Sequence, residues 1–510
     1  MGDSRTANTK RNLYWGMAAK AVGLLLPFLT RSVMIYTLGM RYVGLDSLFK
    51  SLLDVLSFAE LGFGGALVFS MYRPMAERDV KRVNALLAFY RKCYRVIGMV
   101  ILVLGLCMTS FLDIFVNGDV PPEVNLKALF LIQLVNTVTG YFMFAYQSSI
   151  FQAQQRVDIS QKVTLTLNII SNFARIGILL INSNYYIYIL VGPAVTILQN
   201  IFVAYLSRKK YPEYYCEGII SQEEKKDIRD KVYGLMFQKV GGIVLFSVDT
   251  VVISSFLGLE TLGIYNGYYY VITALVGFIS VIQAAVIPSL GNSVVLESKE
   301  KNYQDFRKFH FLLIWLLTWW SACLLCLFQP FMILWQGKEN TLSFGIVALF
   351  CFYFYLHHAG DITYMYKEAA GLWWQGRYCA LLAAALNLAL NLILVQVIGL
   401  PGILISTIIA LVTVNVPYGA WVLFRYYFES RGKYLAYLRR MGWYLLAAVG
   451  IAAVTYGVCL LIPVQKLWPR LICNGAVCTV LPNLLFLGCY WKLDDFQRAF
   501  CYLQGLRKKL

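Results

Sequence analysis

Long apolar segments alternate with short polar loops along almost the whole chain. Windows of about 19 residues identify many segments that are long enough to cross a bilayer as α-helices. The pattern predicts an all-α polytopic membrane protein with about 14 transmembrane helices. They are placed near residues 12–38, 44–69, 95–116, 125–152, 163–182, 185–206, 232–257, 262–290, 309–334, 343–366, 376–398, 402–426, 441–462 and 468–491.

Lysine and arginine outside these spans concentrate in every second loop. The positive-inside rule therefore places both termini in the cytoplasm. The net charge of +18 is then a consequence of topology, and no nucleic-acid partner is expected. The basic segments are the N-terminal tail, the loops 70–94, 153–162, 207–231, 291–308, 367–375 and 427–440, and the C-terminal tail.

The composition excludes an ordinary soluble protein, because hydrophobic residues make up 59% of the chain and charged residues only 14%. The 12 cysteines show no disulfide framework. Cys323 and Cys326 have a redox-like or metal-like spacing, but their surroundings, SACLLCLF, are apolar. Inert, buried thiols are the favoured interpretation, and no metal site is predicted. The first apolar segment is interpreted as a retained helix rather than a signal peptide.

Two short motifs indicate an internal repeat. LGMRYVGL (38–45) and LGLETLGI (257–264) both read LG-x4-G, and their first glycines are 219 residues apart. The same offset aligns Lys20 with Lys239. We therefore predict two parallel six-helix bundles related by a pseudo-two-fold axis, plus two extra C-terminal helices. The predicted parts are an N-terminal bundle (1–206), a cytoplasmic linker (207–231), a second bundle (232–426), and a final part with the last two helices and a basic tail (427–510).

Charged side chains inside the predicted spans are costly and are therefore functional candidates. Lys20 and Arg31 lie only about 20° apart around one helix. Asp46, Lys50 and Asp54 share a face of the next helix. The two helices after the second motif add charged and polar side chains, which predicts a water-filled cavity shared by all four helices. The further candidates are Glu60, Lys239, Asp249, Tyr265, Asn266, Tyr270 and Gln283.

Structural interpretations compete with these functional ones. Lys20, Lys239 and Arg31 could extend their charged ends toward the membrane surface. Lys50 and Asp54, four residues apart, could neutralise each other. The remaining intramembrane polar groups could serve helix packing. They are Glu60, Asp249, Arg175 with Asn168 and Asn172, and the pair His357 and Asp361.

The N-terminal part resembles the bacterial oligosaccharide flippases of polysaccharide biosynthesis. The resemblance rests on TR-x4-IY-x-LG (30–39), AELGFG (59–64) and SMYRPMAERD (70–79). It is specific over about residues 10–100 and topologically consistent to about residue 430. The same superfamily contains the multidrug and toxin extrusion carriers and the peptidoglycan-precursor flippases. Fourteen spans rather than twelve is a feature shared with the last of these.

This resemblance implies a non-enzymatic transporter. It would carry an undecaprenyl-diphosphate-linked oligosaccharide across the bacterial cytoplasmic membrane by alternating access, for cell-surface polysaccharide assembly. The implied partners are that lipid-linked oligosaccharide, membrane lipids, a polysaccharide polymerase and glycosyltransferases, around a monomeric transport unit. No cofactor is expected beyond a coupling ion, H⁺ or Na⁺.

The candidate residues divide among three roles under this hypothesis. Cations would bind the diphosphate, because charge-assisted hydrogen bonds replace its water. Carboxylates would bind the coupling ion, and polar aromatic and amide side chains would contact sugars. The first set is Lys20, Arg31, Lys50 and Lys239; the second is Asp54, Glu60 and Asp249; the third is Tyr265, Asn266, Tyr270 and Gln283.

Four alternatives remain open. One is a cation-coupled multidrug antiporter, whose cationic cargo the lysines and arginine disfavour. Another is a peptidoglycan-precursor flippase of the same superfamily. A membrane glycosyltransferase or polymerase is disfavoured because the outer loops are very short. A scaffold without transport would be supported by a solvent-inaccessible interior around Lys20 and Asp54.

Overall fold

The computed structural model describes residues 5–60, 62–118 and 120–507. Within these ranges, the side chains of residues 5–13, 58–59, 234–235, 237–246, 285, 502–503 and 505–507 lie outside the description. The described residues form α-helices joined by short turns and 3₁₀ or π segments, and no strand occurs among them. The predicted all-α class is therefore confirmed.

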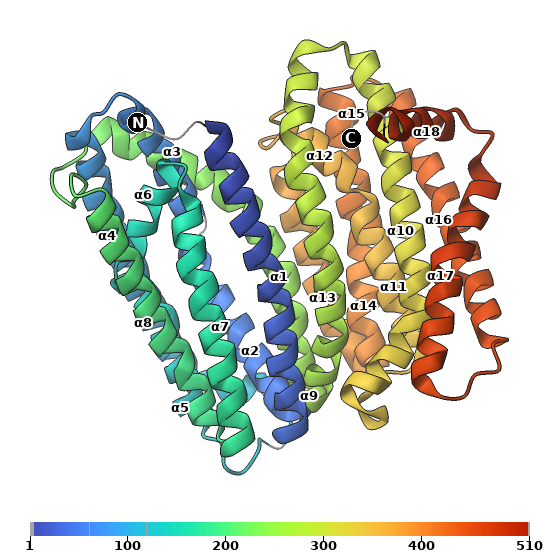
Figure 1. Ribbon diagram of the computed structural model, residues 1–510, viewed down its shortest axis with the longest axis horizontal. Helices are drawn as coiled ribbons and strands as arrows, with labels where there is room; N and C mark the ends of the chain where they lie inside the picture. Colours follow the sequence, from blue (N-terminus) through green and yellow to red (C-terminus); the bar gives the residue numbers. More distant parts are fainter. Residues whose placement is uncertain (1–4, 61, 119, 508–510) are drawn as a thin grey trace. The chain divides into compact units, whose positions relative to one another are not determined.

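The chain divides into two compact units, which we call unit 1 (Met1–Gly263) and unit 2 (Ile264–Leu510). In Figure 1 unit 1 runs from blue to green and unit 2 from green to red. Unit 1 contains α1 (Arg5–Thr37), α2 (Met40–Leu56), α3 (Phe63–Ala76), α4 (Val80–Met108), α5 (Leu126–Phe142), α6 (Ser148–Ala153), α7 (Val157–Ile181), α8 (Tyr185–Lys210) and the part of α9 (Gln222–Leu296) that ends at Gly263. Unit 2 contains the rest of α9, then α10 (Lys299–Gln336), α11 (Phe344–Ala359), α12 (Asp361–Ala369), α13 (Arg377–Ile398), α14 (Leu400–Ala410), α15 (Val416–Tyr426), α16 (Arg431–Leu460), α17 (Leu467–Tyr490) and α18 (Asp494–Arg507).

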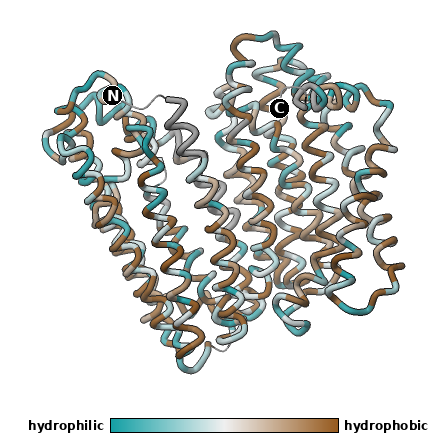
Figure 2. The backbone as a smooth tube through the Cα atoms, in the orientation of Figure 1, coloured by the Kyte–Doolittle hydropathy of each residue, from teal (hydrophilic) through white to brown (hydrophobic). Residues whose placement is uncertain are grey.

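The helices have apolar middle sections and hydrophilic ends, as Figure 2 shows for each unit. Among the described residues, 11 helices are long and apolar enough to cross a membrane, or 12 if α5 and the bent continuation Ala145–Ala153 form one span. The protein is thus a multi-pass membrane protein, but fourteen spans are not confirmed.

Two local features account for the difference. The predicted span 44–69 is interrupted by a 3₁₀ turn, Ser57–Glu60, between α2 and α3. The predicted spans 232–257 and 262–290 correspond to the two limbs of α9, which meet at the non-helical backbone of Gly258 and contribute one candidate span, Ser247–Leu296. In addition, the predicted basic loop 70–94 is mostly helical. There α4 begins one residue after Asp79, whose carboxylate accepts a hydrogen bond from the Arg82 amide.

In unit 2, α10 is the helix around which the others pack, with α11, α16 and α17 all against it. The predicted extra helices are therefore built into this unit. The Trp315 indole donates to Asn483 on α17 at 2.8 Å, and Arg307 forms an ion pair of 2.7 Å with Asp495 on α18. The expected pair of His357 and Asp361 is replaced by His358 and Asp361, at 2.7 Å, because the helix breaks at Gly360.

The two copies of the LG-x4-G motif adopt the same backbone conformation. Gly39 has φ 91° and ψ 175°, and Gly258 has φ 86° and ψ 171°. Only glycine populates this region readily, so each motif begins a new helical segment with a sharp change of direction. The two motifs, 219 residues apart, therefore correspond in backbone conformation. The two predicted bundles and the domain boundaries stay predictions.

The second glycines of the two motifs contact each other within unit 1. A Cβ atom on Gly44 would lie 1.9 Å from the Leu259 carbonyl oxygen, and one on Gly263 would lie 2.2 Å from the Met40 carbonyl oxygen. The contact is reciprocal, because Met40 and Leu259 are themselves equivalent in the repeat. Small residues allow the two backbones to approach this closely. In a membrane, where no hydrophobic force acts between helices, such close packing drives helix association.

An ion pair joins another pair of equivalent positions beside the glycines. Arg41 Nε donates to the Glu260 carboxylate at 3.2 Å, and both side chains are exposed. The pair adds little stability by itself because exposed ion pairs are well solvated. It shows that the two motif copies use the same positions for opposite charges.

We expect Gly44→Ala to lower the free energy of unfolding by about 1–3 kcal/mol, because the added methyl group would collide with backbone that has no room to move. Gly23→Ala is the matched control, since a Cβ atom there meets nothing within 4 Å. The control should be neutral or slightly stabilising. Thermal unfolding of both purified variants in one detergent measures the difference, and equal melting temperatures would contradict the prediction.

Candidate functional site

The exposed face of α2 carries the charges that the sequence predicts there. Lys50 and Asp54 are exposed, whereas Phe49 and Leu53 on the adjoining side of the helix are buried. The ammonium group of Lys50 lies within electrostatic range of the Asp54 carboxylate. No ion pair within 4 Å joins these two residues in the described part of the chain, so both charges stay accessible to a third group. Asp46 accepts a long hydrogen bond of 3.4 Å from Gln133 on α5.

On α1, Lys20 and Arg31 lie in different surroundings. Lys20 is exposed, and the surface at nearby Gly23 is open. Arg31 is half-buried, and its neighbour Thr30 donates a hydrogen bond of 2.8 Å to Asn172 on α7. Because α1 packs along α7, its exposed face is the one that holds Lys20.

Arg31 belongs to a polar cluster between helices of unit 1. The Arg175 guanidinium lies over the Tyr188 ring, with its carbon atom 5.1 Å from the ring centre. The Tyr188 hydroxyl is also within electrostatic range of Arg31 and Asp46. The sequence interpretation of Arg175 as a group that joins two helices fits this geometry. The contribution of Tyr188 was missed, because nothing in a tyrosine-rich segment marks one ring as a cation partner.

Glu60 lies at the 3₁₀ turn and is held by tyrosine hydroxyls. Tyr94 donates to one carboxylate oxygen at 2.6 Å, and Tyr141 donates to the other. Tyr90 donates to the Tyr94 hydroxyl at 3.0 Å, which extends the chain of hydroxyls by one step. Such an arrangement stabilises a half-buried carboxylate without a cation. Tyr90 and Tyr94 are four residues apart, and only that spacing could have suggested a shared role.

The two remaining charged candidates lie on α9. Asp249 is buried, with 8% of its surface exposed. The backbone of Lys239 lies in α9, but its side chain lies outside the described residues. The structure therefore does not place Lys239 against the other predicted cations.

The candidate sugar-contacting residues lie on the second limb of α9, in unit 2. Tyr265 is buried, and its ring stacks on Tyr269 with the ring centres 6.1 Å apart. Asn266, Tyr270 and Gln283 are half-buried. Tyr270 also packs against Trp335 on α10 at 6.2 Å. The burial of Tyr265 leaves its ring less available to a ligand than the others.

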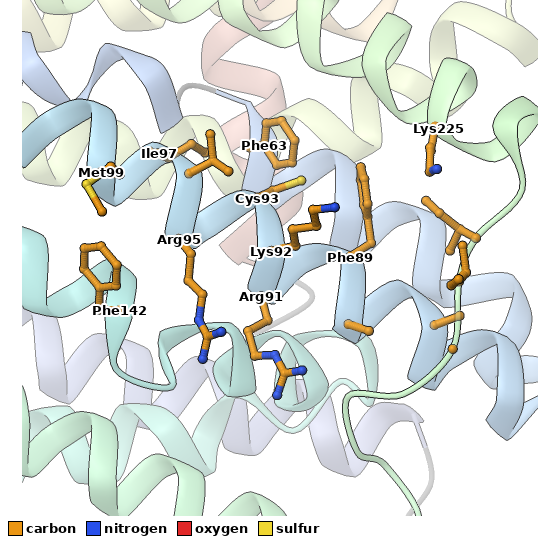
Figure 3. A pocket seen from close by; sticks show the side chains of 16 residues that line it. Phe63, Phe89, Arg91, Lys92, Cys93, Arg95, Ile97, Met99, Phe142 and Lys225 are labelled. Carbon is orange, nitrogen blue, oxygen red and sulfur yellow. The ribbon is translucent and has the colours of Figure 1, made fainter.

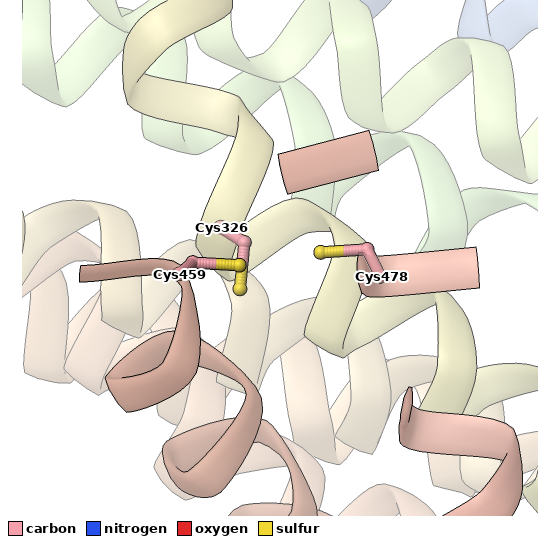
Figure 4. A group of neighbouring side chains, drawn as sticks. All are labelled: Cys326, Cys459 and Cys478. Carbon is pink, nitrogen blue, oxygen red and sulfur yellow. The ribbon is translucent and has the colours of Figure 1, made fainter. Parts of the chain in front are cut away.

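Three buried cysteines from different helices come together in unit 2. The sulfur atoms of Cys326, Cys459 and Cys478 lie within 4.8 Å of one another, and Figure 4 shows them pointing toward a common space. Leu327, Tyr456 and Val477 are among the side chains packed around them. Because a thiolate cluster would bury negative charge in apolar surroundings, we keep the interpretation that these thiols serve packing.

A family model matches more than half of the chain. Residues 9–294 match the family described as "Polysaccharide biosynthesis protein". No curated protein matches the chain.

Solved structures share the fold at low sequence identity. A structure described as lipid II flippase MurJ in an inward closed conformation has a TM-score of 0.64 at 15% identity, covering 94% of this chain and 99% of that chain. An inward-facing multidrug resistance MATE transporter of the MOP superfamily has a TM-score of 0.61 at 14% identity, covering 79% and 94%. A MATE transporter of Vibrio cholerae has a TM-score of 0.56 at 14% identity, covering 84% and 99%.

We expect Tyr94→Phe to lower the free energy of unfolding by about 1.5–3 kcal/mol, because a hydrogen bond to a charged carboxylate is lost while Glu60 stays half-buried. Tyr205→Phe is the control, since that side chain is 59% exposed. Parallel thermal unfolding measures both. A melting temperature of Tyr94→Phe equal to that of the control would show that the hydroxyl does not hold the carboxylate.

Proposed function

Because this chain belongs to the polysaccharide biosynthesis protein family, we propose that it is a flippase for an undecaprenyl-diphosphate-linked oligosaccharide. It would move this lipid across the bacterial cytoplasmic membrane by alternating access, with both termini in the cytoplasm. The family and the fold that the chain shares with MurJ and MATE structures support a transporter rather than an enzyme. The observation that carries the finer proposal is the pair of exposed lysines on α1 and α2 inside predicted membrane spans.

A diphosphate crossing a membrane loses water and needs charged donors in its place. Lys20 and Lys50 offer compact, mobile ammonium groups, while Arg31 offers a planar guanidinium. We assign all three to the diphosphate, together with Lys239 on the basis of its sequence position. The exposure of Lys20 and Lys50 supports this, because a purely structural cation in a membrane is normally paired.

The sugar part would contact Asn266, Tyr270 and Gln283, which are half-buried, and the edge of Tyr265. Amide and phenol groups form hydrogen bonds to sugar hydroxyls, and aromatic faces stack on the apolar faces of sugar rings. The isoprenoid tail would remain in the surrounding lipid, which matches its chemistry. Polysaccharide polymerases and glycosyltransferases would act before or after transport as partners.

The coupling ion would be H⁺ or Na⁺, bound at Asp54, Glu60 or Asp249. Glu60 is the preferred candidate because two tyrosine hydroxyls hold its carboxylate and a third extends the chain. Protonation of Glu60 would convert an acceptor-only group into one that donates to a tyrosine oxygen, so the hydrogen-bonding pattern must rearrange.

A multidrug antiporter of the same superfamily is the second candidate, and the exposed carboxylate of Asp54 favours it. Its cationic cargo would meet Lys50 one helical turn from Asp54. Like charges repel at this distance, so the cationic cargo is disfavoured. A peptidoglycan-precursor flippase carries the same diphosphate chemistry, and the glycan transported decides between the two flippases.

We expect Lys20→Ala and Lys50→Ala each to lower the rate of flipping about tenfold or more, because each removes a charge-assisted hydrogen bond to the diphosphate. Transport of a fluorescent undecaprenyl-diphosphate oligosaccharide in proteoliposomes measures the rate. Lys127→Ala, an exposed lysine at the start of α5, is the control and should be unaffected. Unchanged transport by both lysine variants would refute the diphosphate assignment. Transport of an organic cation instead would support the antiporter.

We also expect Glu60→Gln to make the rate of flipping independent of an imposed proton or sodium gradient, because the neutral amide takes up no proton and lacks the negative charge that would hold Na⁺. Glu77→Gln removes an exposed carboxylate that pairs with Arg73 and serves as control. Proteoliposomes with each gradient applied separately distinguish the ions. If the gradient still accelerates Glu60→Gln, Asp54 or Asp249 must hold the coupling ion.

A further inference from the structure

An open groove of about 1240 Å³ lies on the surface of unit 1 beside α4. Its walls come from α4, from Phe63 at the start of α3, from Phe142 at the end of α5, and from residues 218–220 and Lys225 at the start of α9. In Figure 3 the side chains of Arg91 and Arg95 extend in the same direction from α4, and Lys225 lies on the other side of Phe89. None of the residues assigned above to the transported substrate lines this groove.

The groove is strongly cationic. Arg91, Lys92, Arg95 and Lys225 line it, and no carboxylate does. None of these four side chains forms an ion pair within 4 Å in the described part of the chain. The carboxylate nearest in sequence, Glu224, pairs with Arg82 instead at 2.6 Å. The positive charge is therefore uncompensated, and a ligand for this groove must bring negative charge.

The part of the groove that follows Arg95 along α4 is apolar. Val96 and Met99 are 58% and 51% exposed, and Phe142 is 37% exposed. Phe63 and Phe89 complete the apolar lining. A ligand that covers both parts must therefore be amphipathic.

The boundary between the two parts coincides with a membrane surface. Arg95 is the last charged residue of α4, and residues 96–112 contain none. At about 1.5 Å per residue these 17 residues span about 25 Å, close to the thickness of the hydrocarbon core. Arg91 and Arg95 then lie at headgroup level, and Val96 and Met99 lie at the level of the first methylene groups.

The chain segment 213–220, whose last three residues form one wall of the groove, is held against α4. The Asn84 side chain donates to the Glu213 carbonyl oxygen at 3.2 Å and accepts from the Tyr215 amide at 3.0 Å. Gly218, with φ 96°, passes close to Ala85, where a Cβ atom would be 3.2 Å from the alanine methyl group. The wall therefore exists before any ligand binds, which lowers the entropic cost of binding.

Cys216, just before this wall in the sequence, lies close to the arginines of α4. Burial raises the pKa of the Cys216 thiol, and Arg91, Arg208 and Arg95 act on it in the opposite direction. Beyond it Ile219 is 89% exposed, whereas Ile220 is 4% exposed. Ile220 therefore packs against the protein, and Ile219 is exposed near the arginines of α4.

We propose that this groove binds an anionic glycerophospholipid of the adjacent leaflet. The phosphate and headgroup would contact Arg91 and Arg95, and the acyl chains would lie along Val96, Met99 and Phe142. The site is separate from transport, because it would hold a resident membrane lipid on α4 while the diphosphate cations lie on α1 and α2.

The test uses the full-length protein in nanodiscs that contain phosphatidylcholine and phosphatidylglycerol in equal amounts. Native mass spectrometry of the released protein counts each lipid that remains bound. We expect Arg91→Gln/Arg95→Gln to lower the preference for phosphatidylglycerol about 25-fold, since each basic residue near a membrane surface contributes about fivefold to attraction of an anionic lipid. Lys209→Gln/Arg431→Gln removes two exposed charges outside the groove and should keep the preference.

Two further measurements keep the outcome decisive. Met99→Asp should also release the lipid, because it places a charge against the acyl chains, whereas water-soluble glycerol phosphate should not compete. Equal retention by the arginine variant and its control, or effective competition by glycerol phosphate, would overturn the proposal. Recovery of a bound peptide in place of lipid would do the same. Flipping activity is measured in parallel, so failure of the lipid site is distinguished from failure of the transport assignment.

Discussion

The contact between Gly44 and Gly263 is the constraint on which the architecture of unit 1 depends. With no side chain between them, the two backbones approach so closely that even one methyl group on either glycine would meet a carbonyl oxygen. This contact sets the rotation of α2 about its axis. As a result Val43 and Leu48 face inward, and Lys50 faces outward. A small-residue crossing thus positions a charge that a lipid environment alone would not tolerate.

The charged side chains of unit 1 fall into three groups. Glu60 is satisfied by the hydroxyls of Tyr94 and Tyr141, and Arg175 lies over the ring of Tyr188. The charges of Glu60 and Arg175 are thus satisfied by contacts within the protein. Lys20 and Lys50 are exposed, and their charge is available to something that is not part of the protein. The cations around the groove beside α4 form a third class, because they lie at the membrane boundary rather than within it.

The repeat explains why so much of the backbone could be predicted. Gly39 and Gly258 repeat one strained conformation, and a conformation that only glycine adopts readily is visible in sequence as a motif. The number of spans was harder to predict, because the 3₁₀ turn after α2 has no hydropathy signal and the two limbs of α9 meet without a loop. The partners of Glu60 were not predictable either. Tyr94 is 34 residues away and Tyr141 is 81 residues away, and no pattern links a carboxylate to tyrosines at such distances.

The sequence by itself determined the all-α class, the membrane location of the helices, the shared geometry of the two motifs and the family. These follow from local hydropathy, from the requirement that backbone groups be satisfied within each helix, and from short motifs. Only the tertiary structure decided which charged side chains have partners within the protein and which are exposed. It also showed that the segment 213–225 returns to α4 and completes a cationic groove. Both outcomes depend on side chains brought together from distant helices, which no single segment encodes.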